Sequence, residues 1–179
     1  KKSYSDKNKI VHLILAKQLV GIKVVSIKRV EETEHPVFGK TQIMKGEFRL
    51  SGEEGMINLC IVLGILANQM DEPKFFFSKL VIKADKEDQA TEIPFASKAG
   101  EAFIEAYFAG CFRILSHLQI NHFKFDHLQA IKITSFFVDS PVLKVINFCN
   151  NQLDVKVVKG IIKKIYDNEA IELIDISGN

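Results

Sequence analysis

Histidine and aspartate side chains gather between residues 117 and 127, and this cluster invites a metal site. His117, His122 and His127 lie close to Asp126, and neutral imidazole with a carboxylate is a natural ligand set for transition metals. Residues five apart on one helix point about 140° away from each other, whereas ligands four apart share a face. The spacing therefore favours solvated or hydrogen-bonded histidines in a loop, and we expect neither a metal nor a cofactor.

A cysteine paired with a histidine is the second candidate chemistry. A reactive thiol needs an electropositive, partly exposed setting, whereas each cysteine of this chain lies in an apolar run: Cys60, Cys111 and Cys149. The grouping best suited to an enzyme is Cys111 with Glu105 and His117, provided that one regular helix carries all three. Inert, reduced thiols are the favoured interpretation, and they indicate a cytoplasmic protein.

Neither a carboxylate pair nor a phosphate-binding loop gives a strong indication of a catalytic or binding site. Glu101 and Glu105 share a helix face, but an early position in a helix already favours negative charge through the helix dipole. The glycine-flanked segment 51–55 lacks the lysine and the spacing of a phosphate-binding loop. We therefore expect no catalytic residues.

The segment 154–167 predicts a basic amphipathic helix. Its lysines, Lys159 and Lys163 among them, alternate with Ile161, Ile162 and Ile165. Such a helix could dock on an acidic partner or an anionic surface, but most surface helices show the same solvated lysine face over core-facing aliphatic residues.

The remaining elements follow from periodicity and turn residues. Helices are expected over 6–20, 53–70, 97–119, 141–151 and 154–167, and strands over 22–32, 44–50, 75–84, 128–138 and 170–176. The segment 53–70 is apolar nearly all round and is expected at the centre of the core. In the strand 75–84, Lys79 and Lys83 stand on the face opposite Leu80 and Ile82.

Length and element order predict a single α+β domain over residues 1–179. Helices are expected to pack on a largely antiparallel mixed sheet, and no internal repeat or linker is found along the chain. A hydrophobic share of 47% and a charged share of 26% are typical of a soluble globular protein. No apolar run reaches the length of about 20 residues that spans a membrane.

The composition favours protein contacts over nucleic-acid contacts. The net charge is +2, and 3 arginines, Arg29, Arg49 and Arg113, accompany many lysines, although phosphate-reading surfaces usually use arginine. The 14 phenylalanines favour a dry core or an apolar contact surface.

We therefore expect a non-enzymatic interaction module. It would act as an adaptor, assembly subunit or chaperone-like domain that binds another protein or a second copy of itself. Phe75 and Phe77 are the expected anchors, and Lys159 and Lys163 the expected basic rim. A small-molecule or lipid-binding domain with a Phe-lined pocket between the sheet and the long helix is the first alternative, and an enzyme with a Cys/His site is the second.

Overall fold

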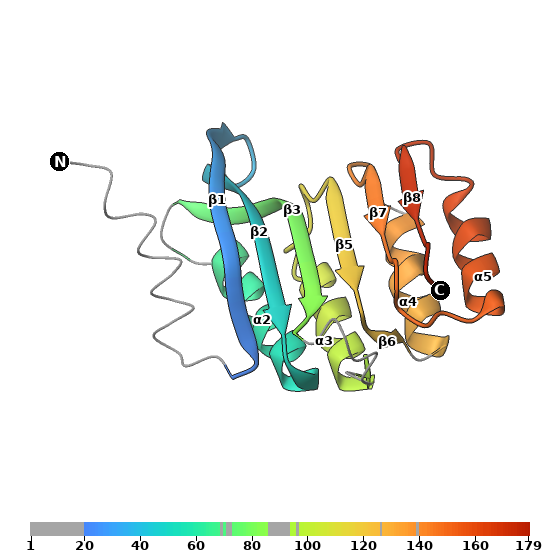
Figure 1. Ribbon diagram of the computed structural model, residues 1–179. Coiled ribbons are helices and arrows are strands. Elements are labelled where there is room, and N and C mark those ends of the chain that lie inside the picture. Colours follow the sequence, from blue (N-terminus) through green and yellow to red (C-terminus); the bar gives the residue numbers. More distant parts are fainter. Residues whose placement is uncertain are drawn as a thin grey trace.

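The computed structural model describes residues 20–179, except for 69, 71–72, 86–93, 96, 126 and 139. In this part of the chain, six strands form one sheet and four helices pack against it (Figure 1). The predicted α+β class is thereby confirmed. The predicted helix over 6–20 lies almost entirely outside the described residues.

The strands and helices alternate along the chain. Their bounds are β1 (Ile22–His35), β2 (Gly39–Leu50), α2 (Gly52–Asn68), β3 (Lys74–Ala84), β4 (Pro94–Phe95), α3 (Ser97–Phe108), β5 (His117–Asn121), β6 (Lys124–Phe125), α4 (His127–Val138), β7 (Val145–Asn147), α5 (Val155–Ile165) and β8 (Leu173–Asp175). The sheet order is β1-β2-β3-β5-β7-β8, and β4 pairs with β6 separately.

Most neighbouring strands of the sheet run parallel. Only β1 and β2 form an antiparallel pair, whereas β2–β3, β3–β5, β5–β7 and β7–β8 are parallel. The prediction of a largely antiparallel sheet was therefore wrong. Helices connect the parallel strands, and parallel strands need such long crossovers, which antiparallel hairpins do not.

The direction of these crossovers decides where the helices lie. Each parallel strand is added on the same side of the previous one, and crossover connections are almost always right-handed. Successive crossovers in one direction must therefore place their helices on the same face of the sheet, and Figure 1 shows α2, α3 and α4 together behind the strands. We call the opposite face, which carries no described helix, the open face.

The core lies between the sheet and the helices. Leu80, Leu118 and Ile146 occupy one row across β3, β5 and β7, and each is at most 1% exposed. The apolar helix α2 packs on β3, but its Ile61 is 50% exposed. The apolar character of α2 predicted a helix that is surrounded on all sides. Instead, α2 is one of the helices that cover the sheet.

A 28-residue repeat underlies the second half of the chain. Leu115, Leu143 and Ile171 recur at this interval, as do Leu118, Ile146 and Ile174, then Ile120, Phe148 and Ile176. Helix α5 begins 28 residues after α4. Hydrogen bonds join equivalent positions at the same separation, for example from Asn151 N to Asn179 Oδ1 at 2.9 Å. The expectation that the chain holds no internal repeat was therefore wrong.

Several predicted elements need correction. The helix expected over 97–119 ends at Phe108, because Gly110 takes a positive φ of 77° and turns the chain into β5. The strand expected over 128–138 is helix α4, and the helix expected over 141–151 is replaced by a loop and β7. The hairpin, β3, α5 and β8 occur where they were predicted.

Candidate functional site

The open face is the candidate functional site, because it presents side chains from all six strands of the sheet. Since side chains alternate between the two faces of a strand, the neighbours of the core residues point to this face. Strand pairing aligns them in three rows: Lys28–Lys45–Lys79–His117–Val145–Leu173, Ser26–Glu47–Val81–Gln119–Asn147–Asp175, and Lys23–Arg49–Lys83–Asn121.

Basic side chains dominate the open face over β1, β2 and β3. Lys28, Lys45 and Lys79 are directly opposite one another on the three strands, and all are exposed. The third of the rows given above holds Lys23, Arg49 and Lys83 in the same arrangement. Between them lies Glu47, whose carboxylate is 3.5 Å from Lys83 Nζ. We call these six basic residues the lysine patch.

Hydrogen-bonded amides occupy the open face over β5, β7 and β8. Asn121, which is 1% exposed, accepts a hydrogen bond from Gln119 and donates to Asn147 Oδ1 at 2.7 Å. Asn147 in turn donates to Asp175 Oδ2 at 2.9 Å. We call Gln119, Asn121, Asn147 and Asp175 the amide ladder. Each member is held by a neighbour, so the polar groups of this half are fixed in place before any partner arrives.

The thiol of Cys149 belongs to the same network. It accepts a hydrogen bond from Asn121 Nδ2 at 2.9 Å. Burial and the nearby negative charge of Asp175 raise the pKa of Cys149, so the thiol stays protonated and takes part as a hydrogen-bonding group. Such a thiol is a poor nucleophile.

Charge of opposite sign stands at the two ends of the open face. Hydrogen bonds from the backbone and hydroxyl of Ser177 hold the pKa of Asp175 below its usual value, so its carboxylate is ionised at neutral pH. At the boundary with the lysine patch, burial and then the charges of Lys79 and Lys45 lower the pKa of His117. Both of these lysines, Lys79 and Lys45, belong to the lysine patch.

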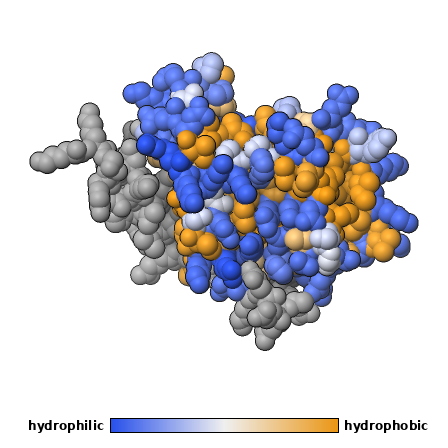
Figure 2. All heavy atoms as spheres, turned by 45° about the horizontal axis from the view of Figure 1, so that its top comes forward, coloured by the Kyte–Doolittle hydropathy of each residue, from blue (hydrophilic) through white to orange (hydrophobic). Residues whose placement is uncertain are grey.

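Polar and apolar side chains are mixed on this side of the molecule. Figure 2, which views the molecule obliquely from above the sheet, shows hydrophobic areas separated by hydrophilic side chains. On the open face, Leu173 is 52% exposed and Val145 is half-buried. Protein interfaces combine apolar contacts with a polar and charged rim in this way.

The predicted interaction residues lie elsewhere. Phe75 and Phe77 are only 4% and 2% exposed and belong to the core, so their burial gives no support to a role as surface anchors. Lys159 and Lys163 are exposed on α5, which belongs to the helical layer and not to the open face. The structure therefore does not bring the four residues together.

The cysteine and histidine candidates also separate. Cys111 is 3% exposed, and burial raises its pKa to about 11. His117 lies on β5 and points to the open face, because the helix that was expected to carry both residues ends at Phe108. Among the residues that the structure describes, no three His, Cys, Asp or Glu side chains are placed to hold a metal ion.

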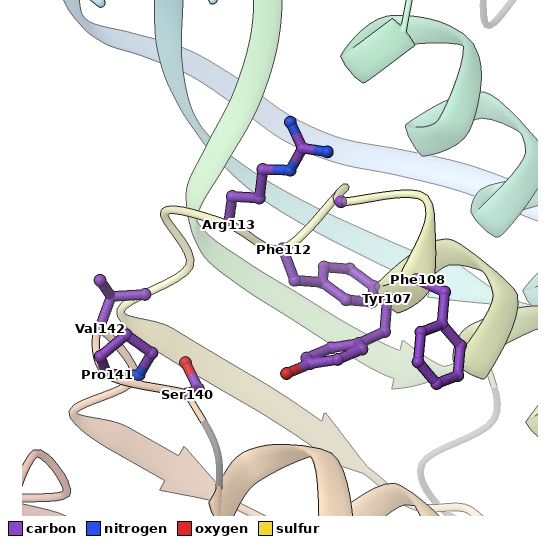
Figure 3. A pocket seen from close by; sticks show the side chains of 8 residues that line it. Tyr107, Phe108, Phe112, Arg113, Ser140, Pro141 and Val142 are labelled. Atoms are coloured by element: carbon purple, nitrogen blue, oxygen red, sulfur yellow. The ribbon is translucent and has the colours of Figure 1, made fainter. Parts of the chain in front are cut away.

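A pocket of about 340 Å³ lies between the end of α3 and the loop before β7. Aromatic side chains from residues 107–112 form one side, and Ser140, Pro141 and Val142 form the other (Figure 3). The guanidinium of Arg113 points away from Ser140 (Figure 3) and lies 4.7 Å from the ring centre of Phe38.

Sequence reasoning could have found the open face through the 28-residue recurrence of the core residues next to it.

None of the helices described is long and apolar enough to cross a membrane. Comparisons with models of known protein families, with curated proteins and with solved structures found no match.

Proposed function

We propose that this protein is a non-enzymatic interaction module that binds another protein through the open face of its sheet. The observation that carries the proposal is the one-sided arrangement of the helices, which leaves the strands of a largely parallel sheet uncovered in the described part of the chain. Parallel sheets are ordinarily covered on both faces, so an uncovered one is a candidate contact surface.

The 28-residue repeat supports the same proposal. The spacing Leu-x-x-Leu-x-Leu-x-x-Asn-x-Leu is typical of leucine-rich repeats, in which strands and helices stack side by side. Residues 143–153 fit this spacing with Leu143, Ile146, Phe148, Asn151 and Leu153. Stacked repeats use extended strand surfaces for binding. This likeness of pattern favours an adaptor or complex subunit over a catalyst.

A cytoplasmic location fits this role. Cys60, Cys111 and Cys149 are all free thiols, and reducing compartments keep cysteines in that state. We also propose proteins and not nucleic acids as partners, and the amides and Asp175 beside the lysines of the open face support this preference.

Site-specific photo-cross-linking tests the proposed surface. A photoreactive amino acid would be placed at Gln119 or Leu173 on the open face, and at Lys159 or Lys163 on α5 as matched exposed positions of the helical layer. We expect a defined cross-linked product in host cells from the open-face positions alone. A product at twice the mass of the chain would identify a second copy as the partner. Cross-links from α5 alone would refute the proposal and favour the predicted lysine rim.

The pocket beside α3 supports a second candidate function, the binding of a small molecule. Its volume of about 340 Å³ lies within the range of ligand sites, and its aromatic lining is typical of them. Native mass spectrometry of the protein purified gently from its host separates the two functions. A small added mass would favour the pocket, and a protein companion would favour the open face.

A further inference from the structure

We propose that the partner of the open face carries an acidic, extended segment that binds across the lysine patch. This inference rests on the proposed function, because it specifies the chemistry of the partner at the same surface. The lysine patch holds Lys23, Lys28, Lys45, Arg49, Lys79 and Lys83. On β1, β2 and β3, Glu47 is the acidic residue within the three rows, and Glu31 stands one row further along β1.

Three exposed lysines of the patch, which form one row across β1, β2 and β3, have no acidic partner in the described part of the chain. Among the described residues, no acidic side chain lies within ion-pair distance of Lys28, Lys45 or Lys79, whereas Lys83 is paired with Glu47. Like charges directly opposite one another on neighbouring strands destabilise a sheet. A row of three such lysines has a cost in the free protein that an acidic partner would remove.

The spacing of the row suits an extended chain. Neighbouring strands lie about 4.8 Å apart, so the path from Lys28 to Lys79 covers roughly 10 Å. An extended peptide repeats its side-chain direction about every 6.6 Å, and two acidic residues separated by one other residue therefore reach this row together.

A polypeptide fits the open face better than a nucleic acid does. The lysine patch contains one arginine, Arg49, and the three rows carry no Phe, Tyr or Trp on which bases could stack. The ionised carboxylate of Asp175 at the far end repels a phosphate chain that extends along the face. An acidic peptide needs to contact only the lysine end.

Fluorescence anisotropy with a labelled peptide of alternating Glu and Ser tests this inference. We expect this peptide to bind the full chain at low ionic strength, and a Lys/Ser peptide of equal length to bind much more weakly. The double variant Lys45→Glu with Lys79→Glu should weaken binding at least about tenfold, since two exposed attractions become repulsions. Added salt should reduce binding of the wild-type chain in parallel.

The matched control is the double variant Lys159→Glu with Lys163→Glu, which changes the net charge equally on α5. It should bind the acidic peptide within about twofold of wild type, because α5 belongs to the helical layer and its lysines do not contact a peptide that is bound on the open face. Equal losses in the two double variants would overturn the inference. Tighter binding of single-stranded oligothymidylate at the same ionic strength would overturn it as well.

The two proposals fail in different ways. Cross-links from Gln119 and Leu173 that persist at wild-type strength in the Lys45→Glu, Lys79→Glu variant would refute the acidic segment and leave the open face as the binding surface. Loss of those cross-links with retained circular dichroism would support both. Cross-links confined to α5 would refute the proposed function itself.

Discussion

Replacing Asn151 by alanine should destabilise the protein far more than the same change at Asn179, its equivalent one repeat later. Asn151 is fully buried, accepts a hydrogen bond from Phe123 N at 2.8 Å and donates to Ile120 O at 2.6 Å. Asn179 makes the equivalent contacts to Asn151 N and Phe148 O, both at 2.9 Å, but it is exposed to solvent. The pair therefore compares the same two contacts in a buried and an exposed setting, although Asn179 also accepts from Leu153 N at 3.1 Å and donates to Ile176 O at 2.7 Å.

The magnitude follows from the groups that lose their partners. Asn151→Ala leaves one buried N–H and one buried C=O unsatisfied, and each such group costs about 1–3 kcal/mol. The expected loss is about 2–6 kcal/mol, a large part of the roughly 5–15 kcal/mol that stabilises a typical domain. At Asn179, water replaces the lost side chain, so we expect a loss below about 1 kcal/mol.

Urea unfolding followed by circular dichroism measures both losses through linear extrapolation. The two variants should keep the m-value of the wild-type chain, because the surface exposed on unfolding does not change. A loss below about 1 kcal/mol for Asn151→Ala, or equal losses at both positions, would refute the reasoning that burial makes this repeat contact strong.

Two further predictions concern titrating side chains. Burial and the charges of Lys79 and Lys45 keep the pKa of His117 below its ordinary value of 6.5. As the pH drops below about 6.5, the unfolded chain therefore binds a proton at His117 before the folded chain does, and the free energy of unfolding should fall. NMR titration should find a higher pKa for His117 in Lys79→Gln than in wild type, and an unchanged pKa would contradict the effect assigned to Lys79. Alkylation at pH 7 should leave Cys111 intact in the folded protein, since burial raises its pKa to about 11, and should modify it only on unfolding. Rapid labelling of Cys111 in the native protein, detected by mass spectrometry, would contradict this prediction and favour the alternative of an enzyme with a Cys/His site.

Local signals predicted the elements that are amphipathic or bounded by turn residues. Helix α5 shows a clear alternation of lysine and isoleucine, and the side chain of Asp154 caps it by accepting from Val157 N at 2.8 Å. The hairpin is bounded by Gly39, whose φ of +67° requires a glycine-like turn. In these segments, local preference and tertiary packing agree.

Helix α4 was missed because its composition favours the opposite structure. Ile131, Ile133 and the two phenylalanines at 136–137 are typical of a strand. The fold overrides this preference, because a parallel sheet needs a crossover helix between β5 and β7. A short sequence window cannot contain that requirement, since the paired residues of β5 and β7 are 28 positions apart in the chain.

The candidate site was missed because equivalent positions of the repeat carry different residue types. Phe123 stands where the following repeats have Asn151 and Asn179, and isoleucine and phenylalanine replace leucine at several core positions. Lys79 was correctly placed on the face opposite Leu80. Its neighbours on that face come from other strands, and only the pairing of β1, β2 and β3 shows that the lysines form a row.

The stepwise sheet order has a consequence for how such a chain can change in evolution. Because β5, β7 and β8 each contact only the adjacent strands of the sheet, a duplicated 28-residue unit inserted after Leu153 could add a strand between β7 and β8 without displacing the others. The gain would be about 4.8 Å of width for each unit. Duplication could thus lengthen the amide ladder while the lysine patch remained as it is. The width of the binding surface and the charge that it presents to a partner would then evolve separately.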